Sequence, residues 1–313
     1  MDTAALDCLE SLLLAALPGV PDEARRLVHG RGRRWPGLEQ VTVDWLQGVL
    51  LVALYRPLPE PAHLVLRERL QALVARPEWQ QCAGRSLLLQ QRHPEQAGSE
   101  WLAGPPCPEW TVYEDGLRYG LTLGSNQNTG LFLDMRPGRR WVREHSAGCR
   151  VLNLFAYTCG FSVAALAGGA ASVVNLDMAR GALARGRDNH RLNGLPLDRV
   201  RFLGHELFRS WGKLRRLGPY ERIIIDPPSF QKGSFVLQQD YGRILRRLPD
   251  LLAPGGQVLA CINDPGVGMD FLLECMAAEA PALQFAGRLA NPPEFADADP
   301  QGGLKALLFV LAG

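Results

Sequence analysis

The sequence predicts an α/β protein: a parallel sheet covered by helices on both faces, with a smaller α+β domain before it. Three observations indicate this class. From Cys149 onward, short apolar segments alternate regularly with helical ones. Before that point, apolar strand-like and leucine-rich segments lack this regularity. Between the two parts, Asp115-Gly116 separates two strand-like segments, as expected for a hairpin with a type I′ turn.

The N-terminal part is predicted to be a domain of residues 1–105, followed by a hairpin and connecting segment of residues 106–147. Residues 1–28 are expected to be helical. Two strands are expected within residues 39–55, separated at Gln47-Gly48, and a helix with regularly spaced leucines is expected at residues 63–74. Residues 92–108, with their Gly and Pro content, are expected to be a linker. The loop from Gly124 to Pro137 carries too many polar groups for a plain spacer.

The C-terminal domain is predicted to span residues 148–313. Its strands are expected at about 150–155, 172–177, 199–203, 221–226, 256–262, 282–288 and 305–311. Its helices are expected at about 161–168, 179–193, 206–214, 236–253 and 267–280. Such alternation implies ligand binding at the carboxyl ends of the strands.

Composition limits the classes of function. With 313 residues, 47% hydrophobic and 21% charged, the chain has enough apolar material for two cores. The apolar segment near the N-terminus contains acidic residues and lacks a basic region before it, so a signal peptide is not expected, and no segment is apolar enough for a membrane span. The seven cysteines lack metal spacing. We therefore expect a reduced, cytoplasmic protein without membrane or metal.

Charge alone does not identify a partner, because the net charge is only +2. Arginines cluster locally, at Arg25, Arg26, Arg31, Arg33 and Arg34 and again at Arg136, Arg139, Arg140 and Arg143. The planar guanidinium suits phosphates and base edges. An ordinary solvated surface explains the same clusters equally well, so both interpretations remain open.

A turn and two acids point to an adenosyl cofactor. The first strand of the domain enters Phe155-Ala156-Tyr157, and Gly160 allows a close approach before the helix. Asp177, next to Met178, ends the second strand about twenty residues later, where a carboxylate accepts ribose hydroxyls. The turn lacks the glycine pattern that a pyrophosphate needs, which favours S-adenosylmethionine over NAD. Glu206 after the third strand is a candidate for the adenine amino group, or simply an acid in a helix's first turn.

The fourth strand carries the most specific motif, Asp226-Pro227-Pro228-Ser229-Phe230. An acid and two prolines at the end of a buried strand make a rigid wall, since proline fixes φ and removes a donor. In methyltransferases acting on amino groups or aromatic bases, such a motif holds a planar ring while an aromatic side chain stacks on it. The motif therefore favours a planar nitrogenous substrate.

With these motifs, the sequence resembles the bacterial 23S ribosomal RNA methyltransferases of the cytosine-C5 (RlmI) and guanine-N7 (RlmK) types, from about Arg25 to the C-terminus. The segments that carry the resemblance are 129–136, 153–161, Asp177, 188–194 and 226–230. The resemblance implies a class I methyltransferase Rossmann-like sheet, S-adenosylmethionine as cofactor, and RNA, of the 23S type, as partner. It also places segment 129–136 over the cofactor, so Phe132, Asp134 and Arg136 become candidates for cofactor or base contact.

The sequence departs from these relatives at Cys159, in the cofactor turn, and at His205, and the RNA-binding PUA domain of the cytosine-C5 type is not expected. Alignment places Asn263 where the cytosine-C5 type has the cysteine that attacks the base. Cys261 lies two residues earlier, inside a strand, and is expected to be structural. The asparagine resembles the guanine-N7 type, in which methyl transfer to a ring nitrogen is direct.

The predicted site therefore has two parts. The cofactor residues are Phe132, Asp134, Arg136, Phe155, Ala156, Tyr157, Gly160, Asp177, Met178, Glu206 and Asp226. The catalytic residues are Asp226, Pro227, Pro228, Phe230 and Asn263. Two alternatives stay open: a methyltransferase for a protein side chain or small molecule, and a non-catalytic RNA-binding protein on a decayed methyltransferase fold. The lone histidines, including His29 and His190, are given no catalytic role.

Overall fold

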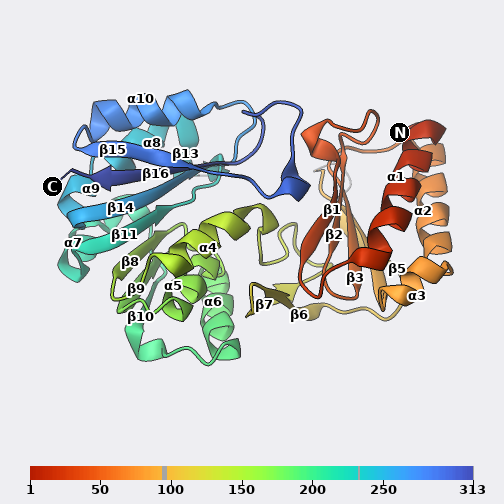
Figure 1. Cartoon of the computed structure of the whole chain (residues 1–313), viewed down its shortest axis with the longest axis horizontal. Helices are drawn as coiled ribbons and strands as arrows, with labels where there is room; N and C mark the ends of the chain where they lie inside the picture. The colour runs from red at the N-terminus through yellow and green to blue at the C-terminus, as the bar shows by residue number, and fades with distance from the viewer. Residues whose placement is uncertain (94–96, 232, 313) are drawn as a thin grey trace. The chain divides into compact units, whose positions relative to one another are not determined.

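The computed structural model describes residues 1–93, 97–231 and 233–312. The chain forms two compact units (Figure 1). The first comprises Met1–Leu133 and Pro292–Pro300, and the second comprises Asp134–Asn291 and Gln301–Gly313. The expected division into an N-terminal domain of residues 1–105, a connecting segment of residues 106–147 and a C-terminal domain of residues 148–313 stays a prediction.

The first unit is built on a five-stranded sheet in the order β1-β2-β3-β4-β5. β3 and β4 are parallel, and the other neighbours are antiparallel. Its strands are β1 (Arg25–His29), β2 (Val41–Trp45), β3 (Val49–Leu54), β4 (Ser86–Gln91) and β5 (Gly98–Ala103). Its helices are α1 (Thr3–Ala16), α2 (Glu60–Leu73) and α3 (Pro77–Gln81), with 3₁₀ turns η1 (Leu17–Gly19) and η2 (Gly30–Gly32).

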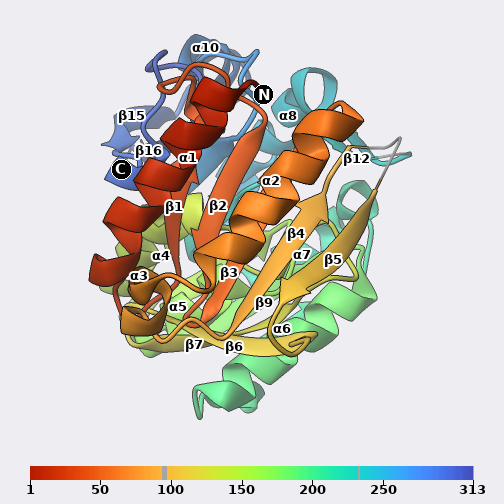
Figure 2. The same ribbon diagram turned by 90° about the vertical axis from the view of Figure 1, so that its right-hand side faces the viewer.

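The core of this unit lies between the sheet and the two long helices. α1 and α2 run side by side across one face of the sheet (Figure 2). Their apolar faces, with Leu9 and Leu13 from α1 and Leu66 and Leu70 from α2, are almost completely buried. This burial of apolar side chains at helical spacing stabilises the packing of the helices on the sheet.

Two expectations for this unit were wrong. The helix predicted for residues 1–28 ends at Ala16, because Pro18 and Pro21 cannot continue it, and the chain then enters β1. The linker predicted for residues 92–108 contains β5, an edge strand in which only Leu102 is fully buried, so its apolar signal is weak. Residues 94–96 of that linker lie outside the described residues.

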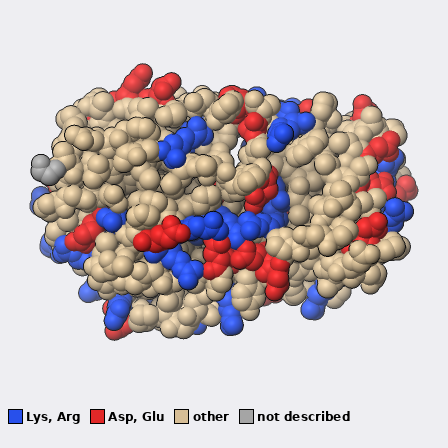
Figure 3. All heavy atoms as spheres, in the orientation of Figure 1, with Lys and Arg blue, Asp and Glu red and all other residues tan. Residues whose placement is uncertain are grey.

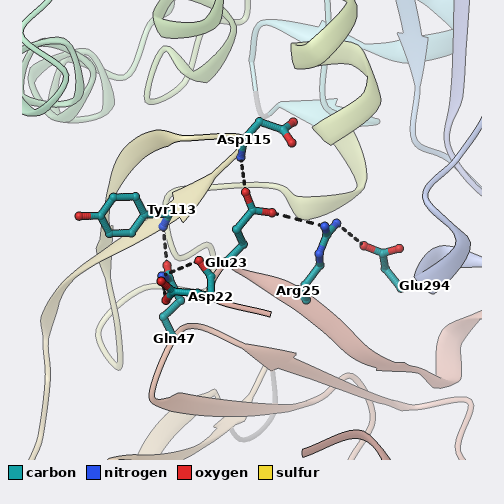
Figure 4. A network of polar contacts seen from close by, with 7 residues as sticks. All are labelled: Asp22, Glu23, Arg25, Gln47, Tyr113, Asp115 and Glu294. Carbon is teal, nitrogen blue, oxygen red and sulfur yellow. Dashed lines mark hydrogen bonds and ion pairs between the residues drawn. The ribbon is translucent and has the colours of Figure 1, made fainter. Parts of the chain in front are cut away.

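The predicted hairpin is confirmed. β6 (Glu109–Glu114) and β7 (Leu117–Thr122) are antiparallel, and both turn residues, Asp115 and Gly116, have the positive φ of a type I′ turn. The hairpin is attached to the five-stranded sheet by polar contacts (Figure 4). Glu23 accepts from the Asp115 amide at 2.8 Å, and Gln47 accepts from the Tyr113 amide.

A segment from late in the chain completes the first unit. It contains η7 (Pro293–Phe295), whose Glu294 pairs with Arg25 at 3.2 Å (Figure 4). The ring of Phe295 lies 4.6 Å from the Arg26 guanidinium and 5.2 Å from the ring of His29. Burial and the nearby Arg26 and Arg31 charges lower the pKa of His29 to about 4, so this histidine is neutral at pH 7.

The second unit is built on a seven-stranded sheet in the order β10-β9-β8-β11-β14-β16-β15. Its strands are β8 (Arg150–Leu154), β9 (Ser172–Leu176), β10 (Val200–Leu203), β11 (Tyr220–Ile225), β14 (Leu252–Ile262), β15 (Leu283–Leu289) and β16 (Lys305–Leu311). The first five strands in this order are parallel to one another, as predicted, whereas β16 is antiparallel to both of its neighbours. The prediction of a wholly parallel sheet was therefore wrong at this edge. Residues 290–304 connect β15 to β16 without a crossover helix, so the chain reverses its direction there.

Helices cover both faces of this sheet. One face packs on α7 (Trp211–Leu217), α8 (Leu237–Leu245), α9 (Leu248–Leu251) and α10 (Met269–Glu279). The other packs on α4 (Arg136–Glu144), α5 (Gly160–Ala167) and α6 (Arg180–Leu192). Alternate residues of β8 point to opposite faces of the sheet. Leu152 packs in the core beneath α7–α10, and Val151 packs in the core beneath α4 and α5.

Two predicted helices differ from the structure. The helix expected at 236–253 is divided into α8 and α9, and β14 begins already at Leu252, since Pro249 interrupts the helical hydrogen bonds. The helix expected at 206–214 begins as the 3₁₀ turn η6 (Leu207–Arg209) and continues as α7. Among the helices of the described residues, none has both the length and the apolar character needed to cross a bilayer.

Candidate functional site

The candidate site lies at the carboxyl edge of the seven-stranded sheet, where the strand order reverses. After β8 the chain adds β9 and β10 on one side and β11 on the other, so β8 and β11 are neighbours. Their parallel register pairs Leu154 with Ile225. The turn that follows β8 and Asp226, which follows β11, therefore start from adjacent positions, and this crevice is where such sheets bind ligands.

The β8–α5 turn has an unusual backbone. Phe155, Tyr157 and Cys159 all have positive φ, at 56°, 47° and 61°. Non-glycine residues rarely adopt this conformation, which costs about 1 kcal/mol or more for each residue. Contacts with the rest of the unit hold the turn in place: the Ala156 amide donates to the Leu176 carbonyl at 3.1 Å. The turn therefore brings its backbone to the sheet edge in a fixed shape before Gly160 begins α5.

Asp177 joins this turn to the end of β9. Its Oδ2 accepts from the Tyr157 amide and its Oδ1 from the Ala179 amide, each at 2.8 Å. A carboxylate has about four acceptor positions, so each oxygen retains one for a further donor. A pair of ribose hydroxyls is such a donor set. Met178, next in the chain, is 44% exposed at the same edge.

A shallow cleft opens beside Asp177. Glu206 lies at its rim and accepts from the Phe208 amide at 2.8 Å. Three aromatic side chains form part of the apolar wall, and the rings of two of them, Phe155 and Phe235, meet edge-on at 5.1 Å. The lining residues are Phe155, Leu176, Asp177, Met178, His205, Glu206, Leu207, Phe208, Gln231, Ser234 and Phe235.

The chemistry of this cleft fits an adenosyl group. Such a ligand needs a carboxylate for two hydroxyls and an apolar, aromatic slot for a flat base with a polar group at its edge. Asp177 supplies the first, and Phe155, Phe208 and Phe235 the second. Of these three rings, the sequence indicated only Phe155. Phe208 could have been suggested by its position two residues after Glu206. Phe235 reaches the cleft through the short hairpin of β12 (Phe230–Gln231) and β13 (Phe235–Val236), which no sequence pattern indicated.

Asp226 lies in a second cluster at the edge. Burial and the nearby charge of Asp134 raise its pKa to about 7, although Arg139 opposes the shift. Asn263, which follows β14, donates from Nδ2 to Asp134 Oδ2 at 3.2 Å. The structure thus brings together three residues, Asp134, Asp226 and Asn263, that the sequence predicted separately. Arg136 and Arg139, both buried in α4, add positive charge to the helix beside this cluster.

The rest of the strand-end motif presents an aromatic side chain to solvent. Pro227 is buried, Pro228 is exposed, and Phe230 lies on the short hairpin of β12 (Phe230–Gln231) and β13 (Phe235–Val236). The Phe230 ring is 65% exposed, the largest value among the exposed large hydrophobic residues. Exposing an aromatic ring next to a rigid strand end gives no folding benefit, and it is typical of a stacking surface for a ligand.

Cys261 lies within β14 and is completely buried. Burial, followed by the nearby Asp226 and Asp134 charges, raises the pKa of its thiol well above the usual value, so it stays protonated. The Tyr241 hydroxyl donates to its backbone carbonyl at 3.1 Å. This environment agrees with the expectation that Cys261 is structural.

One predicted cofactor residue belongs to the other unit. Phe132 is 40% exposed and is the second-last residue of the first unit's main segment. Asp134 and Arg136 belong to the second unit with all the other predicted residues. Within the described residues, no group of three or more His, Cys, Asp or Glu side chains is arranged to hold a metal ion.

A series of hydrogen-bonded, buried polar side chains lies next to the β8–α5 turn. Asn153 donates to Asn175, Asn175 donates to Ser162, and the Ser162 hydroxyl lies 2.9 Å from His190 Nε2. His190 Nδ1 lies 2.7 Å from the Gly186 carbonyl, which assigns the ring proton to Nδ1 and makes Nε2 the acceptor. Burial lowers the pKa of His190, in keeping with a neutral ring. His190 therefore has a structural role that its isolated position in the sequence did not reveal.

The departure at Cys159 is accommodated by a glycine on the neighbouring helix. A Cβ at Gly186 of α6 would lie 2.4 Å from Cys159 Sγ. We expect Gly186→Ala to destabilise the protein by about 1–3 kcal/mol, because this contact overpacks a buried site. In a Cys159→Gly background the same change should stabilise by about 1 kcal/mol, since alanine favours a helix interior over glycine. Urea unfolding of the four proteins measures this; the same sign in both backgrounds would contradict the contact.

Comparisons with known proteins agree with this geometry. The model of the family described as S-adenosylmethionine-dependent methyltransferase matches residues 25–310. The ribosomal RNA large subunit methyltransferase K/L of Hahella chejuensis is 33% identical over 247 residues, which are 75% of this chain and 34% of that protein. The ribosomal RNA large subunit methyltransferase I of Aeromonas salmonicida is 34% identical over 179 residues, 56% of this chain and 45% of that protein. The chain thus spans about a third to a half of these two relatives.

Solved structures show the same fold. A SAM-dependent methyltransferase from Streptococcus mutans has a TM-score of 0.85, and a methyltransferase complexed with SAH has a TM-score of 0.84. Each is 23% identical and the match covers 98% of this chain and 81% of the other. The family match covers nearly all of the chain, and S-adenosylmethionine is the cofactor of that family. This chain belongs to the S-adenosylmethionine-dependent methyltransferase family.

Proposed function

We propose that the protein transfers a methyl group from S-adenosylmethionine to a base of RNA, in particular ribosomal RNA in the cytoplasm. The observation that carries this proposal is Phe230, a 65% exposed ring that follows the rigid Asp226-Pro227-Pro228 strand end. Stacking on such a ring stabilises an unpaired base by about 1–3 kcal/mol. The names of the two curated relatives, both large-subunit ribosomal RNA methyltransferases, support RNA as the substrate.

In this proposal the cofactor lies along the edge from Asp177 to the Phe155–Phe235 cleft. Asp177 accepts the ribose hydroxyls, Met178 and the aromatic rings enclose the adenine, and Glu206 contacts its amino group. Ala156, Tyr157 and Gly160 form the backbone side, and Phe132, Asp134 and Arg136 contact the cofactor or the base. The bound cofactor supplies an electrophilic methyl group. The protein's part is to hold the base's lone pair in line with that methyl group and to exclude water.

We further propose that the acceptor is a ring nitrogen and not cytosine C5. Methylation at C5 requires a thiolate beside the base, because that carbon is not nucleophilic unaided. The nearest candidate, Cys261, is completely buried with a raised pKa, and the position after β14 is Asn263 instead. A ring nitrogen such as guanine N7 already has a lone pair and needs no covalent intermediate. Asp226 and Asn263 then act by orienting the base.

The experiment is methyl transfer from labelled S-adenosylmethionine to ribosomal RNA from a strain that lacks the protein, followed by mass spectrometry of the nucleosides. We expect a guanosine methylated on a ring nitrogen. Cys261→Ala should retain activity within about threefold, because a structural thiol is not needed for direct displacement. Detection of 5-methylcytidine, with activity abolished in Cys261→Ala, would overturn the ring-nitrogen assignment.

The same assay separates the two alternatives. Label in ribosomal protein or in small molecules, with none in RNA, would support a different substrate class. RNA binding without cofactor binding or methyl transfer to any substrate would indicate a decayed enzyme. Either outcome would contradict the RNA-base proposal.

A further inference from the structure

The first unit pairs several of its arginines with acids. On the face of each unit drawn in Figure 3, acidic and basic side chains lie beside one another. Within the arginine-rich segment of residues 25–34, Arg25 pairs with Glu23 and Glu294, Arg26 with Asp44, and Arg33 with Asp297. That segment as a whole is therefore not a free basic surface, and three of its five arginines serve the unit's own structure.

Three other arginines of the unit are Arg31, Arg56 and Arg92, which lie near or next to Tyr55. No carboxylate of the described residues forms an ion pair with Arg31, Arg56 or Arg92, and instead two of the three contact one aromatic ring. The guanidinium carbon of Arg31 lies 4.2 Å from the centre of the Tyr55 ring, and that of Arg92 lies 5.0 Å from it. Arg92 Nη1 also donates to the Tyr55 hydroxyl at 2.9 Å. Arg31 and Arg56 are exposed, whereas Tyr55 and Arg92 are partly buried.

The fold explains why these residues meet. Tyr55 directly follows β3 and Arg92 directly follows β4. These two strands are parallel and in register, Leu54 opposite Gln91, so the residues after them lie at the same sheet edge. Arg31 comes from η2, after β1. Three separate segments thus converge on one ring.

A polar loop adjoins the same group. Arg92 Nη2 donates to Asn128 Oδ1 at 2.7 Å, and Gln90 Nε2 donates to the Asn126 carbonyl at 2.7 Å. These bonds fix part of the loop at 124–130, whose polar content was unexplained by the sequence. The side chains of Asn126 and Asn128 remain exposed. Amide groups of this kind donate to phosphates and pair with base edges.

We propose that this arginine–tyrosine surface, made of Arg31, Tyr55, Arg56, Arg92, Asn126 and Asn128, binds a single-stranded segment of the RNA substrate. The inference rests on the proposed function. It gives the RNA substrate a second binding region, on the first unit, in addition to the catalytic site. Arginine planes and an aromatic ring stack on unpaired bases, while uncompensated guanidinium charges attract phosphates. The surface offers both, and an acidic protein partner would need only the charges.

The test uses fluorescence anisotropy of the full-length protein with a labelled single-stranded oligoribonucleotide. We expect Arg31→Gln/Arg92→Gln to weaken binding at least about tenfold, and to reduce the slope of log affinity against log salt by about 1.4 for two lost phosphate contacts. Arg67→Gln/Arg69→Gln on α2 is the matched control, because it removes the same charge from arginines that are already paired. Its binding should stay within about twofold of the wild type.

Tyr55→Leu tests the stacking part without changing charge, and we expect it to weaken binding about fivefold or more. S-adenosylmethionine binding by each variant reports whether the protein is folded and should stay unchanged. Equal RNA affinity in the Arg31/Arg92 and the Arg67/Arg69 variants would overturn the inference. Competition by poly-glutamate as strong as that by RNA would also overturn it, because it would show a surface that responds to charge alone.

The outcomes also separate this inference from the proposed function. Methylation of ribosomal RNA with no effect of the Arg31 and Arg92 changes on RNA binding or on KM would leave the function standing and remove the surface. Salt-sensitive RNA binding that depends on this surface, without methyl transfer to RNA, would leave the surface and remove the function.

Discussion

Asp177→Ala is expected to weaken S-adenosylmethionine binding about 100-fold or more. Two hydrogen bonds from ribose hydroxyls to a carboxylate contribute about 1.5 kcal/mol each, or about 3 kcal/mol together. Asp177 also accepts from the Tyr157 and Ala179 amides, so its loss loosens the turn itself. Asp177→Asn should fail similarly, because its amide nitrogen would face one of these two N–H donors. Isothermal titration measures the loss.

Asp198→Ala is the control for this experiment, since Asp198 is an exposed acid of the same unit. It should bind the cofactor like the wild type. Circular dichroism of each variant shows whether the fold persists. Full binding by a folded Asp177→Ala protein would mean that the ribose is held elsewhere and that the proposed site is wrong.

Asp226→Asn is expected to make the protein more stable and less active. The raised pKa, from 3.8 to about 7, means that folding disfavours the ionised carboxylate. Below pH 3.8 the carboxyl is protonated in both the folded and the unfolded protein, so the free energy of unfolding does not change with pH through this group. As pH rises from 3.8 to 7, only the unfolded state releases its proton, so wild-type stability falls by up to about 4 kcal/mol and then levels off. The asparagine variant avoids this loss.

Urea unfolding at several pH values tests the stability part. The advantage of Asp226→Asn over wild type should be about 2 kcal/mol at pH 5 and about 4 kcal/mol at pH 8. Asp198→Asn, which changes an exposed acid, should show no such trend. An advantage that is the same at pH 5 and pH 8 would mean that Asp226 does not titrate in this range.

The effect of Asp226→Asn on methyl-transfer activity should be opposite to its effect on stability: the variant gains stability and loses activity. Asp226 is a stronger hydrogen-bond acceptor for the base when it is ionised, so kcat/KM of the wild type should rise as pH increases through about 7. Asp226→Asn should lower kcat/KM by about 10- to 100-fold at pH 8, the loss of one hydrogen bond to a charged group. Its remaining activity should not follow this pH profile. A substitution that increases stability and decreases activity is typical of an active-site residue, because such a residue is kept for function at a cost in stability.

The sequence predicted the catalytic sheet better than the N-terminal sheet, for a physical reason. Strands such as β9 and β11 are buried on both faces, so each appears as an apolar run, and the acids Asp177 and Asp226 mark their ends. β1 and β5 bury only one core residue each and contain arginine, serine and glutamate. Edge strands of this kind depend on pairing with a neighbour, which local sequence does not show.

The site was predicted in part for the same reason. Residues placed directly after a strand, including Asp177, Asp226 and Asn263, could be found by counting along the chain. Phe235 and Arg139 could not, because a hairpin of two very short strands and a buried face of α4 bring them to the edge. The contact of Asn263 with Asp134, 129 residues apart, likewise depends on tertiary packing.

The late segment at 292–300 has a consequence for the order of synthesis on the ribosome. Gly32 leaves no room for a Cβ against the Ala296 carbonyl, and its own carbonyl accepts from the Ala298 amide at 2.7 Å. The first unit therefore lacks these contacts until almost the whole chain has emerged, and its completion must follow translation of most of the second. A fragment ending at residue 133 would expose His29 and leave Arg25 and Arg33 without Glu294 and Asp297. An autonomous version of this unit would need residues 292–300 supplied as part of the same polypeptide.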